Sequence, residues 1–358
     1  MTSQIKKVGV IGAGTMGAGI AGQVANAGTE VWLLDLPSND ENVNILSTKG
    51  LERLKDSDMP GLMSEEAEKL INLGNTRDHF HELEDCDWIA EAVVERLDIK
   101  KALYRRLNDA CKKSTIITSN TSTIPIQLLT EGMPTEFCER FAITHFFNPV
   151  RFMRLLELVR GEFTSDDVIN TLDVFSEINL GKGVVSCSDT PGFLANRVGV
   201  FAIQCALHNA FDLKLSPTEA DAFFGRPLGL PKTGVFGLYD LIGIDLMADV
   251  VKSLVSILPE NDAFHNYSTP IDFVTNMIAN GQTGNKNEKG FYRQDGDERK
   301  VINLSNGEYI QHERLKTPLI DMAEKNGLSV ILNDCLLYTS DAADDTHCVD
   351  LGGRRIIK

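Results

Sequence analysis

The stretch VGVIGAGTMGAGI at residues 8–20 decides the fold. A short apolar run leads into the pattern GxGxxG at residues 12–17, and a helical pattern then continues to Ala27. Glycines in such a turn let the backbone approach a pyrophosphate, and the N-terminus of the helix offers it free N–H groups. Any tight turn from strand to helix can also carry this pattern. The residues of the turn that we predict to bind a dinucleotide are Gly12, Gly14, Thr15, Met16 and Gly17.

The chain after this turn favours the dinucleotide interpretation. An apolar, β-prone run from Thr29 to Leu34 ends on Asp35, about 20 residues beyond the first glycine, where a carboxylate can accept hydrogen bonds from the adenosine ribose. A negative charge there repels a 2′-phosphate, so the sequence predicts NAD rather than NADP as the cofactor. The alternative for Asp35 is a solvated acid at the end of a strand.

Strand and helix patterns alternate as far as residue 187. This alternation indicates a mostly parallel, doubly wound sheet with helices on both faces, a Rossmann-type α/β domain over residues 1–189. Over residues 190–292 the pattern is helical with Gly/Pro turns, which predicts an all-helical second domain. The apolar, β-prone runs lie at 8–12, 29–34, 87–94, 114–118, 141–146, 155–159 and 183–187, and the helical patterns lie at 45–56, 64–73, 98–111 and 165–178.

Composition excludes several classes of protein. The 358 residues carry a formal charge of −16, whereas a protein that coats nucleic acid or an anionic membrane needs a basic surface. The seven cysteines lie far apart without a CxxC pair, so we expect neither a disulfide framework nor a metal site. No apolar run is long enough to span a bilayer, and the first residues lack the pattern of a signal peptide. We therefore expect a cytoplasmic protein.

One histidine and one glutamate stand in two neighbouring apolar runs. His145 lies in FAITHFF at 141–147, and Glu157 lies in LLELV at 155–159. A buried carboxylate is costly without a partner, so a loop that turns the chain back would place Glu157 beside the imidazole. Glu157 would then fix the imidazole tautomer and stabilise its protonated form, and His145 could take a proton from a substrate hydroxyl. The alternative for His145 is a residue that is simply buried in the core.

Two further polar sites follow apolar or turn segments. The cluster SNTST at 119–123 follows a predicted strand, and open α/β sheets bind ligands at the carboxyl ends of their strands. An N-cap for the next helix is an equally good interpretation of this cluster. Asn196 begins a helical pattern after the turn DTPGF, and its amide could point back toward His145.

Several motifs, in order and at matching spacing, resemble those of the L-3-hydroxyacyl-CoA dehydrogenase family over residues 5–292. The resemblance implies oxidation of the (3S)-hydroxyl of a 3-hydroxyacyl-CoA to the ketone, with hydride transfer to NAD, in fatty-acid β-oxidation. It also implies a homodimer, with the helical domain supplying the acyl-chain cleft and the dimer interface. The matching stretches are VGVIGAGTMGAGIA, DWIAEAVVERLDIKKALYRRL, STIITSNTSTIPI, THFFNPVRFMRLLELV, LGKGVVSCSDTPGFLANRV and GLYDLIGID.

The resemblance also implies roles for single residues. His145 would be the general base and Glu157 its orienting partner, while Ser122 and Asn196 would hydrogen-bond the reacting substrate oxygens. The residues that would contact the cofactor are Glu95, Lys100, Ser122 and Asn148. The basic residues where family members often contact CoA are Lys49, Arg53 and Lys55, for which a solvated helix face is an equally good interpretation.

The sequence after residue 292 suggests a longer polypeptide. VINLSNGEY at 301–309 resembles the connector of multifunctional members, in which a second helical domain and an enoyl-CoA hydratase domain follow. We therefore expect residues 293–334 to be a connector and the start of a further domain. Residues 335–358 carry neither helical nor strand periodicity and resemble the translated read-through of a sequencing adapter, so we expect a non-native tail there.

Two other functions remain compatible with the dinucleotide motif. A dehydrogenase of the β-hydroxyacid type shares the pattern GxGxMG, but it uses a catalytic lysine on a helix in place of a His–Glu pair. A structural dinucleotide-binding protein, or an inactive fragment, would need no acid–base pair. The intact HFFNP…E stretch disfavours the β-hydroxyacid type. The presence of His145, Glu157, Ser122 and Asn196 argues against lost catalysis, although truncation of the chain remains a route to an inactive fragment.

Overall fold

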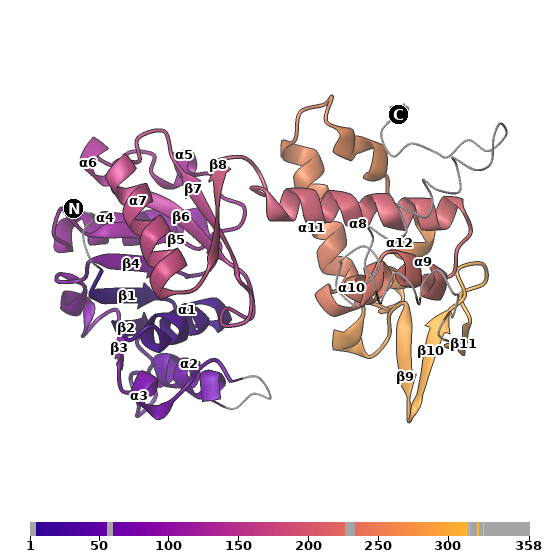
Figure 1. The fold of residues 1–358 in the computed structure, drawn as a ribbon, viewed down its shortest axis with the longest axis horizontal. Helices are drawn as coiled ribbons and strands as arrows, with labels where there is room; N and C mark the ends of the chain where they lie inside the picture. Colours follow the sequence, from indigo (N-terminus) through magenta and orange to yellow (C-terminus); the bar gives the residue numbers. More distant parts are fainter. Residues whose placement is uncertain are drawn as a thin grey trace. The chain divides into compact units, whose positions relative to one another are not determined.

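The computed structural model describes residues 5–55, 60–225 and 233–313, together with residues 315, 321 and 325. Its contacts divide the chain into two compact units, Met1–Arg197 and Val198–Lys358 (Figure 1). This division lies a little beyond the expected boundary at residue 189, because the backbone around residue 195 bonds to a carboxylate of the first unit. The expected tail at 335–358 lies outside the described residues.

The first unit is built on one eight-stranded sheet with the strand order β3-β2-β1-β4-β5-β6-β7-β8. All neighbouring strands are parallel except β6 and β7, which are antiparallel. The order reverses at β1, between β2 and β4, which is the place where such sheets bind ligands. The predicted doubly wound α/β fold is thus confirmed. The strands are β1 (Lys7–Ile11), β2 (Glu30–Asp35), β3 (Ile71–Asn75), β4 (Trp88–Glu91), β5 (Ile116–Ser119), β6 (Phe141–Phe146), β7 (Leu155–Arg160) and β8 (Gly183–Ser188).

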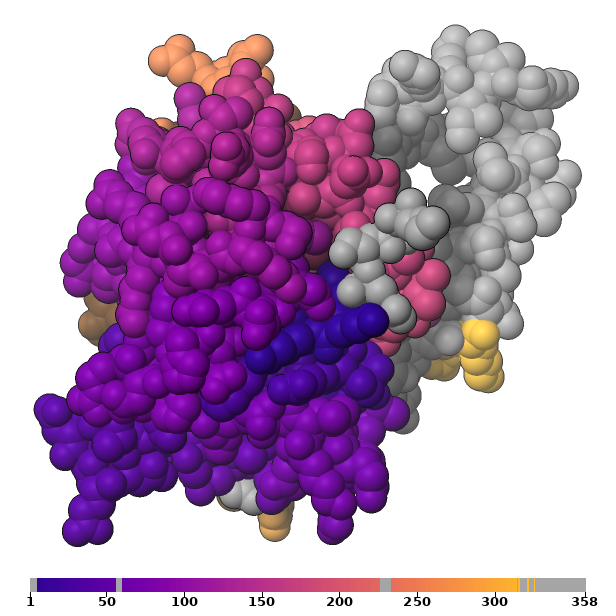
Figure 2. All heavy atoms as spheres, turned by 90° about the vertical axis from the view of Figure 1, so that its left-hand side faces the viewer, coloured from indigo at the N-terminus to yellow at the C-terminus, as the bar shows by residue number. Residues whose placement is uncertain are grey.

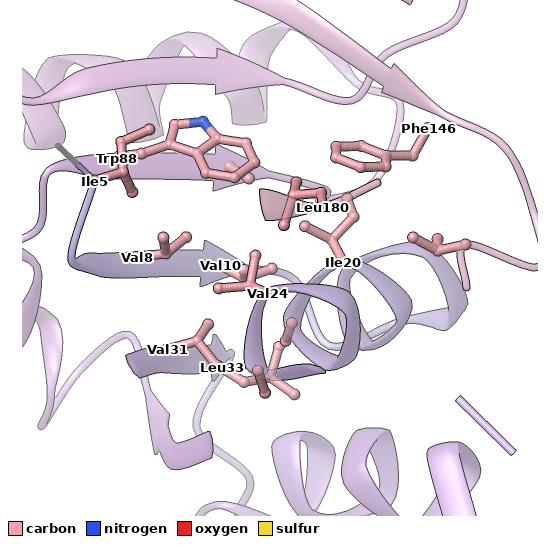
Figure 3. Close-up of a cluster of buried hydrophobic side chains, with 14 of the residues drawn as sticks. Ile5, Val8, Val10, Ile20, Val24, Val31, Leu33, Trp88, Phe146 and Leu180 are labelled. Carbon is pink, nitrogen blue, oxygen red and sulfur yellow. The ribbon is translucent and has the colours of Figure 1, made fainter. Parts of the chain in front are cut away.

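Helices cover both faces of this sheet because its strands are apolar on both. Val10 of β1 packs in one cluster, where Ile20 and Val24 of the first helix face the strands (Figure 3). Its neighbour Ile11 packs in a second cluster with Tyr104, as expected for side chains that alternate across a strand. The helices are α1 (Thr15–Asn26), α2 (Ile45–Lys55), α3 (Glu65–Glu68), η1 (Phe80–Leu83), α4 (Leu97–Ala110), α5 (Ile126–Leu129), α6 (Thr135–Cys138), α7 (Asp166–Val174) and η2 (Phe175–Asn179).

Residues 64–73 differ from the prediction of a helix. Ser64 caps the short α3 by accepting a hydrogen bond from Ala67 N (3.2 Å), α3 ends at Glu68, and β3 begins at Ile71. β3 pairs in parallel with β2. The prediction was wrong because a short local pattern carries no information about the edge of β2 that β3 covers.

Segments that are far apart in the sequence meet on the surface of the first unit. Figure 2 shows indigo, purple and magenta side chains packed against one another on a single face. Among the residues that the structure describes, no helix is long and apolar enough to cross a membrane. Two clusters of buried apolar side chains lie on either side of the sheet of this unit.

The second unit is helical and carries a small antiparallel sheet with the strand order β11-β10-β9. Phe291, Val301 and Ile302 of this sheet region share one hydrophobic core with Phe236 of α10. Residues 293–311, expected as a connector, therefore belong to the fold of this unit. The elements are α8 (Ala195–Asp212), α9 (Pro217–Phe223), α10 (Gly234–Ile242), α11 (Ile244–Ile257), η4 (Ala263–Tyr267), α12 (Asp272–Ala279), η5 (Asn285–Asn287), β9 (Tyr292–Asp295), β10 (Glu298–Ile302) and β11 (Tyr309–Gln311).

Two carboxylates, the buried Asp240 and the half-buried Asp221, connect this sheet to the helices. Asp240 of α10 accepts hydrogen bonds from Phe291 N (2.8 Å) and Tyr292 N (2.7 Å). Asp221 of α9 accepts hydrogen bonds from Phe236 N and from the Tyr292 hydroxyl, both at 2.7 Å. Burial raises the pKa of Asp240 to about 7 and the pKa of Asp221 to about 6. The joint between α10 and β9 therefore titrates close to neutral pH.

Candidate active site

A pocket of about 410 Å³ opens beyond the carboxyl ends of β4, β5 and β6. Larger cavities lie elsewhere in the chain, so we identify this site by its chemistry and its place on the sheet rather than by its size. The predicted site residues that line it are Met16, Glu95, Lys100, Ser122, His145, Asn148 and Asn196. The predicted residues that do not line it, and instead form the adjoining glycine-rich turn and the end of β2, are Gly12, Gly14, Thr15, Gly17 and Asp35.

The glycine-rich turn has open space where a dinucleotide needs it. Gly12 has φ +100°, and a Cβ there would lie 2.4 Å from the carbonyl oxygen of Ala92. A Cβ on Gly17 would lie 1.7 Å from the carbonyl oxygen of Gly12, so both positions require glycine. Gly14 has no atom within 4 Å of such a Cβ, and it precedes the N-terminus of α1 at Thr15, which has no side-chain cap. This open helix N-terminus fits a pyrophosphate.

Asp35 connects the end of β2 to this turn. Its Oδ2 accepts a hydrogen bond from Ala13 N (2.5 Å), and its Oδ1 accepts one from Leu36 N (2.7 Å). The side chain stays half-buried at the strand end. It is therefore fixed in position beside the glycine-rich turn, on the side where an adenosine ribose would follow the pyrophosphate.

The three basic residues considered for CoA lie on α2, and the structure uses them differently. Arg53 donates a hydrogen bond to the carbonyl oxygen of Ala13, so it supports the glycine-rich turn. Lys55 pairs with Glu68 (2.8 Å), and Lys49 is exposed. This hydrogen bond gives Arg53 a structural role at the turn.

The antiparallel pairing of β6 and β7 sets His145 directly opposite Glu157. His145 Nδ1 lies 2.6 Å from Glu157 Oε2. The imidazole is largely buried, and its ring centroid lies 4.5 Å from that of Phe147. Because Nδ1 is engaged by the carboxylate, Nε2 is the ring nitrogen that can serve a ligand in the pocket.

Glu157 is fully buried and keeps its charge through hydrogen bonds. Its Oε1 accepts bonds from Leu194 N (2.9 Å) and Ala195 N (2.6 Å), where α8 begins. Burial acts to raise the pKa of the Glu157 carboxyl, but the hydrogen bonds from His145, Ala195 and Leu194 outweigh it and hold the pKa below its ordinary value. The carboxylate is therefore ionised at neutral pH and can stabilise a protonated imidazole.

Polar side chains from three segments complete the pocket. Ser122 lines it from the loop after β5, and Asn196 lines it from the first turn of α8; both are half-buried. Asn120 Oδ1 accepts a hydrogen bond from Phe146 N (2.9 Å), which ties the loop after β5 to the end of β6. Asn148 lines the pocket as an exposed residue of the loop after β6.

A buried cluster behind the pocket contains residues that sequence reasoning missed. Glu91, the last residue of β4, accepts hydrogen bonds from Lys100, Tyr104 and Ser119. Lys100, predicted from the family resemblance to contact the cofactor, has a side chain that is only 1% exposed. The signal that marked Glu157, a carboxylate inside an apolar run, is also present at Glu91 in WIAEAVV.

Two family models match the chain in order. The model of the NAD binding domain of 3-hydroxyacyl-CoA dehydrogenase matches residues 7–190, slightly more than half of the chain. The model of the C-terminal domain of 3-hydroxyacyl-CoA dehydrogenase matches residues 192–294. Among solved structures, (S)-3-hydroxybutyryl-CoA dehydrogenase from Ralstonia eutropha is similar with 30% identity and a TM-score of 0.67, over 82% of this chain and 100% of that one.

Two relatives show how far the similarity extends. A putative fatty acid oxidation complex trifunctional enzyme of Rickettsia prowazekii is 41% identical over 312 residues, which are 87% of this chain but 42% of that protein. The chain thus spans less than half the length of this relative. A probable 3-hydroxyacyl-CoA dehydrogenase of Deinococcus radiodurans is 39% identical over 83% of this chain and 85% of its own length. Because both domain models and this last relative agree along most of the chain, it belongs to the 3-hydroxyacyl-CoA dehydrogenase family, whose N-terminal domain binds NAD.

Proposed function

We propose that this chain oxidises the (3S)-hydroxyl of a 3-hydroxyacyl-CoA to the ketone with NAD as the hydride acceptor. The observation that carries the proposal is the 2.6 Å contact between His145 Nδ1 and the buried Glu157 Oε2, where His145 lines a pocket beside the glycine-rich turn. A hydroxyl becomes a carbonyl only when a hydride and a proton both leave, so the reaction needs a base next to a dinucleotide site. The names of the Deinococcus and Ralstonia proteins support this substrate class.

Each residue of the site has a separate role in the proposed reaction. Nε2 of His145 takes the hydroxyl proton, and the electron pair of the O–H bond forms the carbonyl as the C–H bond releases its hydride. Glu157 fixes the imidazole tautomer through Nδ1 and stabilises the positive charge that develops on the ring. Ser122 and Asn196 orient the substrate oxygens by hydrogen bonds. When bound, NAD supplies the hydride acceptor.

The cofactor lies along the turn and one wall of the pocket in this proposal. The open helix N-terminus receives the pyrophosphate, and Asp35 accepts hydrogen bonds from the ribose hydroxyls. The residues that would contact the cofactor are Gly12, Gly14, Thr15, Met16, Gly17, Asp35, Glu95, Lys100, Ser122 and Asn148.

The wider role rests on the relatives. The Rickettsia protein is named a trifunctional enzyme of fatty acid oxidation, and it is more than twice as long as the matched region. Both facts support the proposal that this chain is the dehydrogenase part of a multifunctional polypeptide in fatty-acid β-oxidation. We place it in the cytoplasm, since the five cysteines that the structure describes are all free thiols. The second unit would form the acyl-chain cleft and a homodimer interface.

Spectrophotometry of NADH formation tests the proposal. The full chain is mixed with NAD and with (3S)-3-hydroxyacyl-CoA substrates of several chain lengths, and the (3R) enantiomers serve as matched controls. NADH is expected from the (3S) compounds alone. Absence of NADH with every chain length would overturn the proposal, and oxidation of free β-hydroxyacids in their place would favour the β-hydroxyacid class.

A further inference from the structure

Glu91 is a fully buried carboxylate directly behind the wall of the pocket. Its Oε1 accepts hydrogen bonds from Lys100 Nζ (2.6 Å) and Val93 N (2.8 Å). Its Oε2 accepts hydrogen bonds from the Tyr104 hydroxyl (2.5 Å) and Ser119 Oγ (2.7 Å). A buried carboxylate is costly unless its oxygens are satisfied, and four donors from α4, β5 and the loop after β4 satisfy it here.

Lys100 links this buried carboxylate to the pocket. Its Nζ lies 2.6 Å from Glu91 Oε1 and 3.2 Å from Glu95 Oε2. Glu95 is exposed, and together with Lys100 it lines the pocket. Glu95 Oε1 also accepts hydrogen bonds from the hydroxyls of Thr121 and Thr123, in the loop after β5. The series Glu91, Lys100, Glu95 therefore connects both loops of the pocket wall to the interior of the sheet.

We infer that Glu91 is a positioning residue for NAD binding: its negative charge holds the Lys100 ammonium in the buried cluster, and Lys100 in turn holds Glu95 at the pocket wall. The inference rests on the proposed function, because it takes this pocket as the cofactor site. No bond is made or broken at Glu91. Its influence on the cofactor passes through Lys100.

The charge of Glu91 can be separated from its shape. Glu91→Gln keeps the volume and one acceptor oxygen, but it leaves Lys100 with a single carboxylate partner, the exposed Glu95. Burial disfavours the charged ammonium, and in the variant the buried negative charge that offsets this penalty is gone. The affinity of the variant for NADH should then fall as the pH rises, whereas a purely structural role would weaken binding equally at every pH.

Other titratable groups near Lys100 enter the design of the test. Tyr104 lies on the same helix, Glu91 at the end of β4, Glu95 in the loop before α4, and His145 of β6 lines the same pocket. Burial and the Glu91 charge raise the pKa of Tyr104 well above its ordinary value, so it stays a neutral donor. His145 is present in every variant compared. Only the difference between each variant and the wild type is therefore attributed to Lys100.

NADH binding by fluorescence, measured on the full chain from about pH 6 to about pH 9, tests the inference without any substrate. In Glu91→Gln we expect the dissociation constant to rise about tenfold at alkaline pH, and to recover toward pH 6. Glu91→Asp keeps the charge, so its dissociation constant for NADH should not rise at alkaline pH. The matched control is Glu131→Gln, which removes an exposed partner of Lys101 on the same helix and should bind as the wild type does.

Each outcome decides the inference. Wild-type affinity of Glu91→Gln across the pH range would overturn it, and so would a loss that is the same at every pH. If Glu91→Gln does not fold, the double variant Glu91→Gln/Lys100→Met takes its place, because it leaves no unpaired buried charge. We expect this double variant to fold and to bind NADH weakly, without pH dependence. Wild-type affinity of the double variant for NADH would overturn the inference. A wild-type chain that binds NADH but oxidises no 3-hydroxyacyl-CoA would overturn the proposed function alone.

Discussion

Glu157 keeps its negative charge in the interior because donors from two separate segments converge on it. The His145 imidazole comes from β6, and two backbone N–H groups come from the start of α8. The hydrogen bond that keeps the carboxylate ionised also fixes the orientation of the imidazole. Removing the charge, rather than the whole side chain, is therefore the informative change at this site.

Glu157→Gln and His145→Gln are each expected to lower kcat by about 10²- to 10⁴-fold, because the proton of the substrate hydroxyl loses its acceptor or that acceptor loses its orientation. NADH affinity should change little, since neither residue belongs to the proposed cofactor contacts. Steady-state kinetics and NADH fluorescence check the two parts. Glu136→Gln, which removes an exposed partner of Lys113, is the control. Near-normal turnover in both site variants would reject the mechanism.

Asp35 combines a structural bond with a charge, and two substitutions separate them. Asp35→Asn retains an oxygen that can accept from Ala13 N but removes the negative charge, whereas Asp35→Ala removes both. We expect Asp35→Asn to raise the affinity for NADPH relative to NADH, because a 2′-phosphate is no longer repelled. Asp35→Ala should in addition weaken NADH binding. Fluorescence titrations with both nucleotides measure this, and an unchanged NADH/NADPH ratio in Asp35→Asn would contradict the assignment.

Among the elements, those with a strong local pattern were predictable and those defined by partners were not. The runs around β1, β6 and β7 carry their own apolar pattern, so the α/β class and the neighbouring positions of His145 and Glu157 could be anticipated. β3 could not, because its strand conformation depends on the edge of β2. Glu91 stood in an apolar run as plainly as Glu157 did, but its partners come from α4 and β5, and only the folded chain brings them together.

The loop after β6 is held by one buried lysine, and this gives an element-scale prediction. Lys182 donates hydrogen bonds to the carbonyl oxygens of Val150 and Met153, in the segment that follows Asn148. Lys182→Met should lower the free energy of unfolding of the first unit by about 1–3 kcal/mol, because the two carbonyls lose their donor. Denaturant unfolding followed by tryptophan fluorescence measures this, with the exposed Lys113→Met as control.

The stability difference between the wild type and Lys182→Met should depend on pH, and the direction of this dependence follows from the pKa of Lys182. Burial lowers the pKa of Lys182 to about 8, below the ordinary 10.5. Between these values the unfolded chain binds a proton that the folded chain has released, so the stability of the wild type rises with pH in that window. The difference between the wild type and Lys182→Met should therefore grow above about pH 8. A difference that stays constant with pH would show that Lys182 has the same pKa in the folded and the unfolded chain.

At the scale of the whole molecule, the two units have separate hydrophobic cores and separate spectroscopic signals. Both tryptophans of the chain, Trp32 and Trp88, belong to the first unit. The second unit is mostly helical, so its unfolding changes the far-UV circular dichroism without a tryptophan signal of its own. The two measurements together assign a change in stability to one unit or the other.

The joint between α10 and β9 predicts a pH dependence of the second unit alone. A carboxyl whose pKa is raised by burial, as for Asp240 from 3.8 to about 7, holds a proton in the folded chain where the unfolded chain has released it. The free energy of unfolding therefore falls as the pH rises between these values, by at most about 4 kcal/mol. Asp240→Asn should flatten the curve measured by circular dichroism and leave the tryptophan curve unchanged. An equally steep circular dichroism curve in the variant would assign the titration to other carboxylates, because an amide in place of the Asp240 carboxyl cannot ionise. The amide still offers one oxygen to a backbone N–H group of Phe291 or Tyr292.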